Sequence, residues 1–478
     1  MLSVGVWDRI GVYQFGVFFM SRAPFPRRHT LTASALTSLA WLAIAAEARA
    51  ETLDEVLATA YNSNPSLMSA RASVRGTDEQ LPLALSGWRP TVSVSGAAGR
   101  GQYFNNFSPL IPYTTQRSVM DYTVVVTQPL YSGGRTVAQT AQAEGAIQAD
   151  RAQLEVTENQ VLLSAATAFL DVARDSAIVK LNINNEQVLT KDLEMARKRF
   201  QEGELTRTDV AQAEARLAQA NAERKAAEGN LQASRAAFVA IIGRPPETPV
   251  PPVSLPTVPD SLEATKTTAR DNNPAVKAAD WQARAAHEAI DAVQGELLPT
   301  VALQGTYGRN VNEFLEGAET RTATGMLTVS MPLYEGGATY ARVRAQKQQW
   351  GQRLVEIEKA KRDAIQAATQ SWENAASAHA RVISYTSQIA ANELALTGVK
   401  EEAKVGSRTV IEVLNAELEL FTARVNEVVA RHDELVASYQ IRSAIGQMKA
   451  KDLTLPVDIY DPSTHYNDVR SRWIGTAE

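Results

Sequence analysis

One six-residue segment occurs twice in this chain, and the two copies constrain the fold more than any other feature. The copies are Pro129-Leu130-Tyr131-Ser132-Gly133-Gly134 and Pro332-Leu333-Tyr334-Glu335-Gly336-Gly337, which lie 203 positions apart. The same offset relates Gly203 to Gly406. Similarity at a fixed offset indicates that one structural unit is present twice. We therefore expect two repeats of one unit and not several unrelated domains.

Proline-rich and polar segments delimit the two repeats. Residues 51–243 form the first repeat and residues 262–448 the second, each with the order helix, β-hairpin, long helix, helix. Between them, residues 244–261 contain seven prolines, a composition typical of an extended linker. Residues 449–478 form a polar C-terminal tail, which we expect to be a surface segment or disordered.

The first fifty residues have the layout of an export signal. A basic stretch at 22–29 precedes an apolar stretch at 31–46, and Ala48-Arg49-Ala50 follows. This order is typical of a secretory signal peptide with a small-residue cleavage site. Residues 1–50 are therefore predicted to be a signal peptide, whose layout fits a start at Met20. An N-terminal membrane anchor is the alternative.

The periodicity changes from helical to strand-like after Pro90 and again after Pro299. After each proline, apolar and polar residues alternate in two runs that are separated by a polar loop. Runs of about ten alternating residues fit membrane-spanning strands, although alternation alone also fits a soluble two-hairpin sheet. The four runs lie at 91–98, 121–127, 300–307 and 326–331.

Two long segments keep a helical rhythm of apolar residues. Residues 132–202 and 335–404 contain no proline, and about 70 residues of helix span roughly 105 Å. Gly203 and Gly406 end these segments, and helices about half as long follow them. Because two half-length helices placed end to end match one long helix, we expect a helical array of uniform length.

A four-stranded sheet has a consequence for assembly. Four strands cannot close into a barrel by themselves, and an open sheet edge cannot face lipid. Two copies would supply eight strands with a filled interior, and three copies about twelve strands with room for a lumen. The predicted fold class is an α+β membrane protein with two repeats, in which long helices continue the wall of an oligomeric β-barrel with four strands per chain.

These motifs resemble the TolC family of outer-membrane efflux and secretion channels. The resemblance rests on both strand-to-helix joints and on Val405-Gly406-Ser407-Arg408-Thr409-Val410-Ile411-Glu412-Val413-Leu414-Asn415-Ala416, with Gly203-Glu204-Leu205-Thr206-Arg207-Thr208-Asp209-Val210 as its first-repeat counterpart. It extends over residues 52–448. Since the chain has no cysteine, it cannot carry a lipid on an N-terminal Cys, as in the unlipidated branch of the family.

The resemblance implies an assembly, a function and partners. Three chains would form one trimeric 12-stranded β-barrel, which is continued by a long periplasmic α-helical barrel. The protein would be a homotrimeric outer-membrane channel-tunnel that exports small molecules such as drugs, or proteins, as the exit duct of a tripartite efflux pump or a type I secretion system. It would contact outer-membrane lipid and dock to a periplasmic adaptor (a membrane fusion protein), which belongs to an inner-membrane pump or ABC transporter.

The resemblance also implies a latch at the two glycine turns, which would form the periplasmic tip. Arg408 would hydrogen-bond Thr208 or Asp209 of the other repeat in the closed state. The family usually adds a Tyr three positions before the second glycine, where this chain has Ala403. Without the resemblance, an exposed Arg at a helix start explains Arg408 equally well.

Two further residues match the pore constriction of the family. Glu412 and Asn415 are three positions apart and therefore lie on one helix face. The family typically has two acids here, and three copies of Glu412 would form one carboxylate ring that favours cations. A solvated Glu on a helix is the alternative for Glu412.

The same tip would contact the adaptor, and the joints would bend the chain. The implied adaptor contacts are Gly203, Leu205, Gly406 and Ser407, although both glycines would also serve simply to permit a turn.

In each strand-to-helix joint, Pro is expected to end the hydrogen-bond ladder of the strand and the Gly pair to permit the bend into the helix. The joint residues are Pro129, Gly133, Gly134, Pro332, Gly336 and Gly337.

Other protein classes fit the sequence less well. A net charge of −5 without a basic stripe argues against nucleic-acid binding. The five His have no metal-ligand spacing and no nucleophile motif is present, so we expect no metal, no cofactor and no enzymatic activity. A periplasmic coiled-coil adaptor or structural protein of an export complex is the main alternative, but it would not explain four alternating runs.

Overall fold

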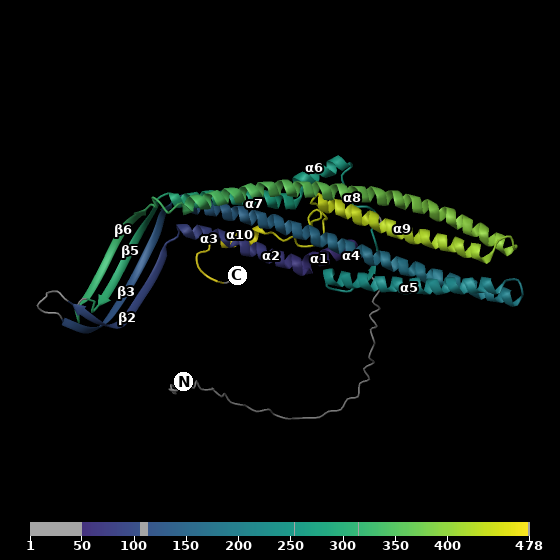
Figure 1. Ribbon diagram of the computed structural model, residues 1–478, viewed down its shortest axis with the longest axis horizontal. Helices are drawn as coiled ribbons and strands as arrows, with labels where there is room; N and C mark the ends of the chain where they lie inside the picture. The colour runs from purple at the N-terminus through teal and green to yellow at the C-terminus, as the bar shows by residue number, and fades with distance from the viewer. Residues whose placement is uncertain (1–49, 106–112, 253, 314, 477–478) are drawn as a thin grey trace, which may run out of the picture. The chain divides into compact units, whose positions relative to one another are not determined.

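The computed structural model describes residues 50–105, 113–252, 254–313 and 315–476. The predicted signal peptide and the start at Met20 fall on 1–49 and lie outside the described residues, apart from Ala50. Long helices run side by side, and a four-stranded sheet extends from one of their ends (Figure 1). None of the described helices combines the length and apolarity needed to cross a membrane.

The four predicted strands form one antiparallel sheet. In order across the sheet, they are β2 (Thr91–Asn105), β3 (Tyr113–Ser132), β5 (Thr300–Val311) and β6 (Glu319–Ser330). The two hairpins, one from each repeat, join through β3 and β5. The outer strands β2 and β6 expose alternating valines and leucines, such as Val94 and Leu327, so an apolar face is presented outside this chain.

The two strand-to-helix joints differ, although their sequences match. The prediction that proline ends the strand is wrong at Pro129, because β3 continues to Ser132 after a bulge between Pro129 and Tyr131. Tyr131 and Ser132 pair with β5, which lies on that side of β3. Among the described strands, β6 is paired on one side only, and it ends at Ser330, before Pro332. A strand therefore extends past its proline only where a neighbouring strand can pair with the residues that follow it.

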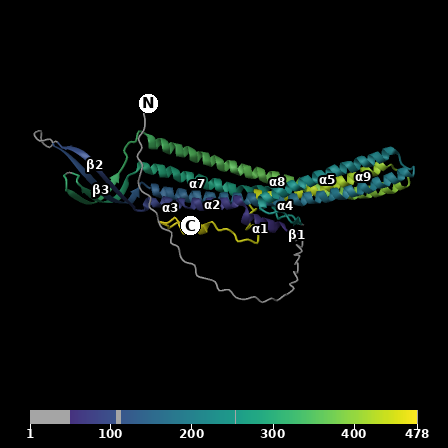
Figure 2. The ribbon, with the colours of Figure 1, turned by 90° about the horizontal axis from the view of Figure 1, so that it is seen from below.

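The two long helices have the same length. Helix α4 (Arg135–Gln201) and helix α8 (Ala338–Lys404) each contain 67 residues, and their bounds are related by the offset of 203. Each begins after a left-handed glycine, Gly134 with φ 76° and Gly337 with φ 83°. Helices α5 (Arg207–Ile242) and α9 (Val410–Ala444) then return along the far halves of α4 and α8 (Figure 2).

Shorter helices cover the halves of α4 and α8 nearer the sheet. Each repeat breaks its first helix at an Asn-Pro pair, because the Pro lacks the N–H that a helix interior requires. The elements are α1 (Leu53–Ser63), α2 (Pro65–Asp78), α3 (Gln80–Leu85), α6 (Leu262–Asn272), α7 (Pro274–Gln294), and the 3-10 turns Ser86–Trp88 and Gly295–Leu297.

The asparagine of each pair joins three helix ends. Asn64 accepts from the Ser66 N–H at 2.9 Å, which caps α2, and donates to the Ile241 carbonyl at the end of α5 at 2.9 Å. Asn273 repeats this arrangement with Ala275 and with the Ala444 carbonyl at the end of α9. Each short returning helix therefore meets the start of another, as the end-to-end arrangement predicts.

The linker between the repeats pairs with the start of the described chain. Strand β4 (Thr248–Pro249) lies parallel to β1 (Ala50–Glu51). The buried Glu51 carboxylate accepts from the Glu247 N–H at 2.9 Å and forms an ion pair with Arg244 at 2.5 Å. These contacts fix the linker against the first repeat.

Of the two alternatives for the C-terminal tail, the structure of residues 449–476 fits a segment packed on the helices and not a disordered one. Ala450 and Leu455 are buried in the main core beside Phe169 and Phe238. A short helix, α10 (Ser463–Val469), then lies against α2. The sequence pattern missed this segment because its apolar residues are spaced irregularly and contact residues about 300 to 400 positions away.

The first joint is sterically tighter than the second, and this difference is testable. A Cβ at Gly133 would lie 2.2 Å from the Gly295 carbonyl oxygen, whereas one at Gly336 would have no atom within 4 Å. Both glycines have positive φ, 68° and 63°, which costs an alanine about 1–2 kcal/mol. We expect Gly133→Ala to lower the thermal unfolding temperature far more than the matched Gly336→Ala, as followed by circular dichroism. Equal shifts would show that the close approach is unimportant.

Candidate functional site

The ends of the long helices away from the sheet form two matching turns. Gly203 and Gly406 both have φ 80°, a conformation that glycine adopts without steric cost. One residue later, the Glu204 N–H donates to the Arg199 carbonyl and the Ser407 N–H to the Glu402 carbonyl, at 2.9 and 3.0 Å. The two glycines therefore close equivalent helix ends, which we call the tip.

Each returning helix starts with a Thr and an acid three residues later. The Thr206 N–H and hydroxyl donate to Asp209 at 2.9 and 2.7 Å, and the Thr409 N–H and hydroxyl donate to Glu412 at 2.7 and 2.9 Å. These are capping boxes, which satisfy N–H groups that a helix start leaves free. The spacing Thr-x-x-Asp/Glu would have been enough to predict these capping boxes from the sequence. The roles assigned to Asp209 and Glu412 from the sequence did not include capping.

Arg408 forms its ion pairs within its own turn. Its Nε lies 2.8 Å from Glu402 and its Nη1 2.8 Å from Glu412. In this chain the Arg408 guanidinium is thus bound by Glu402 and Glu412, while Asp209 caps its own helix. The hydrogen bond to Thr208 or Asp209 of the other repeat stays a prediction. The Thr409 backbone N–H and the Arg408 guanidinium lower the pKa of Glu412 to about 2, so its carboxylate is ionised at neutral pH.

A cavity of about 620 Å³ lies between the two turns. Leu205, Asp209, Gly406 and Arg408 all line it, so the structure brings together four of the residues that the sequence singled out, from both repeats. Leu205 also packs beside the buried Leu193 and Leu414. Ser407 lies outside this lining, and its hydroxyl donates to the Glu402 carbonyl at 2.9 Å.

Asn415 lies on α9 and is held by the first repeat. Its side-chain oxygen accepts from Arg216 of α5 at 2.9 Å. Glu412 and Asn415 are each contacted by an arginine, Arg408 and Arg216. The surface that both residues share is thus less negative than the sequence of α9 alone indicates.

A buried carboxylate, Glu417, and a half-buried one, Asp192, lie close together near the tip, and no sequence pattern predicted this pair. Glu417 of α9 is 6% exposed and forms an ion pair with Lys400 of α8 at 2.5 Å. Burial and the neighbouring Glu417 raise the pKa of Asp192 on α4 to about 7. Lys400 and Glu417 lie on consecutive helices, whereas Asp192 lies on α4 of the first repeat, about 200 residues earlier, so only the fold brings the three together.

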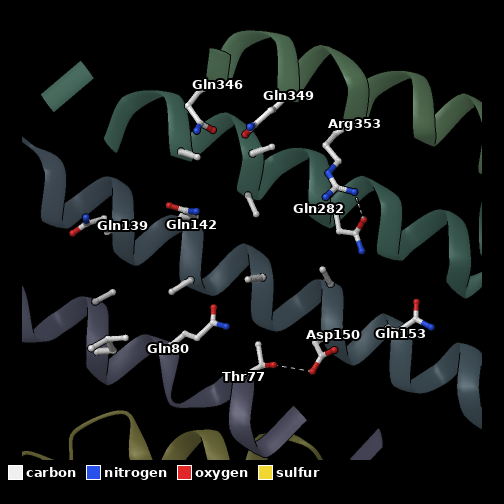
Figure 3. A pocket seen from close by; sticks show the side chains of 18 of the residues that line it. Thr77, Gln80, Gln139, Gln142, Asp150, Gln153, Gln282, Gln346, Gln349 and Arg353 are labelled. Atoms are coloured by element: carbon white, nitrogen blue, oxygen red, sulfur yellow. Dashed lines mark hydrogen bonds between the residues drawn. The ribbon is translucent and has the colours of Figure 1, made fainter. Parts of the chain in front are cut away.

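A second cavity of about 1,070 Å³ lies between α2, α3, α4, α7 and α8 (Figure 3). We call it the glutamine groove, because its lining is mostly amide and alanine side chains. Its two charged side chains have partners: Asp150 accepts from Thr77 at 2.9 Å, and Arg353 pairs with Glu356 at 2.8 Å. The lining amides are Gln80, Gln139, Gln142, Gln153, Gln282, Gln346, Gln349 and Gln352.

The raised pKa of Asp192 predicts a pH-dependent stability. Protonated Asp192 is favoured in the folded protein, so its stabilising contribution is present below its ordinary pKa and is lost as the pH rises toward about 7. The unfolding temperature of the wild type should fall between about pH 4 and about pH 7, and Asp192→Asn should reduce that fall. Glu204→Gln, which removes an exposed carboxylate at the same tip, should keep the wild-type profile. Parallel profiles of wild type and Asp192→Asn would contradict the assignment.

Comparisons with known proteins agree with this architecture. The family model described as "Outer membrane efflux protein" matches residues 56–244 and 267–447, one segment per repeat. Outer membrane efflux protein BepC of Brucella suis is 34% identical over 431 residues, which cover 90% of this chain and 92% of the relative. Outer membrane protein TolC of Escherichia coli is 23% identical over 421 residues, with 85% and 84% covered.

A solved structure has the same fold. The Campylobacter jejuni CmeC outer membrane channel superposes with a TM-score of 0.74 at 14% identity, which covers 88% of this chain and 89% of that chain. The family match extends over both repeats and most of the described helices. The chain therefore belongs to the outer membrane efflux protein family, and it is a non-enzymatic efflux or secretion channel of the TolC type, located in the outer membrane with a periplasmic helical extension.

Proposed function

We propose that three copies of this chain assemble into one channel-tunnel. The observation that carries this proposal is the sheet, in which β2 and β6 each pair on one side only among the described strands. In lipid such edges require partners, and three copies provide about twelve strands around a lumen. The chain contains no cysteine, which supports an unlipidated channel.

The glutamine groove would form part of the lumen wall in this assembly. Its amides hydrogen-bond water and polar solutes, Arg353 is paired with Glu356, and the Asp150 carboxylate accepts a hydrogen bond from Thr77. Such a lining, mostly uncharged, offers passage to many polar solutes without a strong binding site. This predominantly uncharged lining supports an exit duct in preference to a selective porin.

The tip would dock to a periplasmic adaptor, which would link the channel to an inner-membrane pump or ABC transporter. Gly203 and Gly406 have no atom within 4 Å of where a Cβ would lie, so both turns present bare backbone. Leu205 and Ser407 flank these glycines in the chain. Val405 is 80% exposed beside Gly406 and offers an apolar contact at the same place.

The proposed gate consists of the two turns and their ion pairs. Arg408 would hold the second turn closed through Glu402 and Glu412 of its own chain. The contact from Arg408 to Thr208 or Asp209 of the other repeat stays a prediction. A ring of three Glu412 would set cation preference, weakened by the Arg408 beside each carboxylate.

Export by this channel predicts a loss of resistance on deletion. A strain that lacks the gene should become several-fold more susceptible to detergents and antibiotics, or lose a secreted protein from its medium. The full-length gene should restore the phenotype, and a Val405→Asp, Leu205→Asp variant, which charges the proposed adaptor contact, should not restore it despite normal outer-membrane levels. Unchanged susceptibility and an unchanged set of secreted proteins would overturn the proposal.

The ion pairs of Arg408 predict two separable changes in single-channel recordings. Arg408→Ala should raise conductance several-fold, because the turn loses its link between Glu402 and Glu412, and should raise cation preference, because Glu412 is no longer paired. Adding Glu412→Gln should remove only the gain in preference.

Lys404→Ala is a charge-matched control for that experiment. Lys404 pairs with Glu401 at 2.6 Å along α8 and does not link the turn to α9. This variant should leave conductance near the wild-type value. A conductance of Arg408→Ala equal to that of the control would show that Arg408 does not hold the gate.

A further inference from the structure

The C-terminal tail runs back along the first repeat to the start of the strands (Figure 1). Near the core, the Tyr460 N–H donates to the Tyr61 hydroxyl at 3.0 Å. At the other end, Arg89 donates to the Arg472 carbonyl at 2.8 Å. Tyr61 and Arg89 are separated by α2 and α3, whose 20 residues rise roughly 30 Å. The tail therefore connects the middle of the helices to the base of the sheet.

A buried carboxylate anchors the tail halfway. Asp78 of α2 is fully buried and lies 3.2 Å from His465 of α10 and 3.6 Å from Arg151 of α4. Arg151 also donates to the Pro462 carbonyl at 3.3 Å and lies 5.0 Å from the centre of the Tyr466 ring. Because a buried carboxylate without partners is costly, this cluster holds α10 in one place.

Beyond this anchor, two large apolar side chains of the tail are exposed. Trp473 is 65% exposed and Ile474 is 90% exposed. The Arg89 guanidinium lies 4.9 Å from the Trp473 ring centre, and Arg89 precedes the first residue of β2 by two positions. These side chains therefore lie at the level where the membrane-spanning sheet begins.

The chemistry of the tail end matches a phospholipid surface. Tryptophan is enriched at membrane–water interfaces because its ring is apolar and its N–H is polar. Arg470, Arg472 and Arg89 place positive charge beside Trp473 and Ile474, which suits lipid phosphates. Trp88 and Leu298 are also exposed and lie just before the first strand of each repeat. They add apolar side chains near the base of the sheet.

The tail lies on the face of the helices opposite the glutamine groove. Asp150 lines the groove, whereas its neighbour Arg151 contacts the tail. Figure 3 shows the groove residues on one side of α2 and α3 and the tail, in yellow, on the other. If the groove faces the lumen, as proposed above, the tail lies on the outside of the tunnel, where lipid is accessible.

We propose that Trp473 and Ile474 insert into the headgroup region of the inner leaflet of the outer membrane, where they anchor the tail. The anchor would brace the base of the sheet against the helices through Asp78 and His465. This inference rests on the proposed orientation of the groove and goes beyond the channel function. A neighbouring protomer that covered the same side chains would be the competing occupant.

The absence of cysteine allows a direct test on the full-length protein. Ile474→Cys, labelled with an environment-sensitive fluorophore, is reconstituted into phospholipid vesicles that contain nitroxide-headgroup lipid. We expect several-fold stronger quenching than at the matched Ile459→Cys, which is 53% exposed on the same tail but lies next to Tyr460, near the core. Labelled Ser471→Cys should lose its quenching when Trp473→Glu and Ile474→Glu are added.

The possible outcomes separate the anchor from the channel function. Weak nitroxide quenching at position 474, equal to that at 459, would overturn the anchor. So would a label at 474 that is shielded from aqueous iodide yet not quenched by lipid, since a neighbouring protomer would then cover it. Ion flux through the same vesicles measures the channel separately, so a channel that conducts without quenching at 474 contradicts only the anchor.

Discussion

The whole helical arrangement depends on one side-chain amide in each repeat. A helix end leaves backbone groups without intrahelical partners, and here two ends meet at the same place. Asn64 and Asn273 satisfy both, because the oxygen caps the start of one helix and the NH2 group donates to a carbonyl at the end of another. Short helices can then follow one another beside a 67-residue helix without leaving a gap in the wall.

The two repeats have equivalent glycine turns and strands, but these are packed differently in each repeat. Gly133 and Gly336 occupy equivalent positions, yet only Gly133 touches the backbone of another element, at Gly295. Likewise, β3 is an inner strand and runs past its proline, whereas β6 is an outer strand and stops before its own. Duplication thus supplies equivalent parts, and their place in the sheet decides how each one is packed.

The sequence predicted most of the fold, because it depends on local patterns. Periods of 2 and 3.6 separated strands from helices, and one offset predicted the bounds of α8 from those of α4. The packing of the tail and the cluster of Asp192, Lys400 and Glu417 were not predicted, since no local sequence pattern connects the residues that make these contacts. The sequence reasoning did not anticipate that Arg408 pairs with Glu402 and Glu412 in its own turn, because its partners were sought in the other repeat and not among the nearby carboxylates.

The tip therefore holds two classes of charge with different consequences for opening. The pairs of Arg408 and of Arg199 with Glu204 are exposed, so solvent screens them and a docked partner can exchange them at little cost. The pair of Lys400 and Glu417 is buried on the Glu417 side, and separating α8 from α9 would leave a buried carboxylate without its cation. Movement at the tip is thus favoured where it rearranges the turns while α8 and α9 move together as one pair.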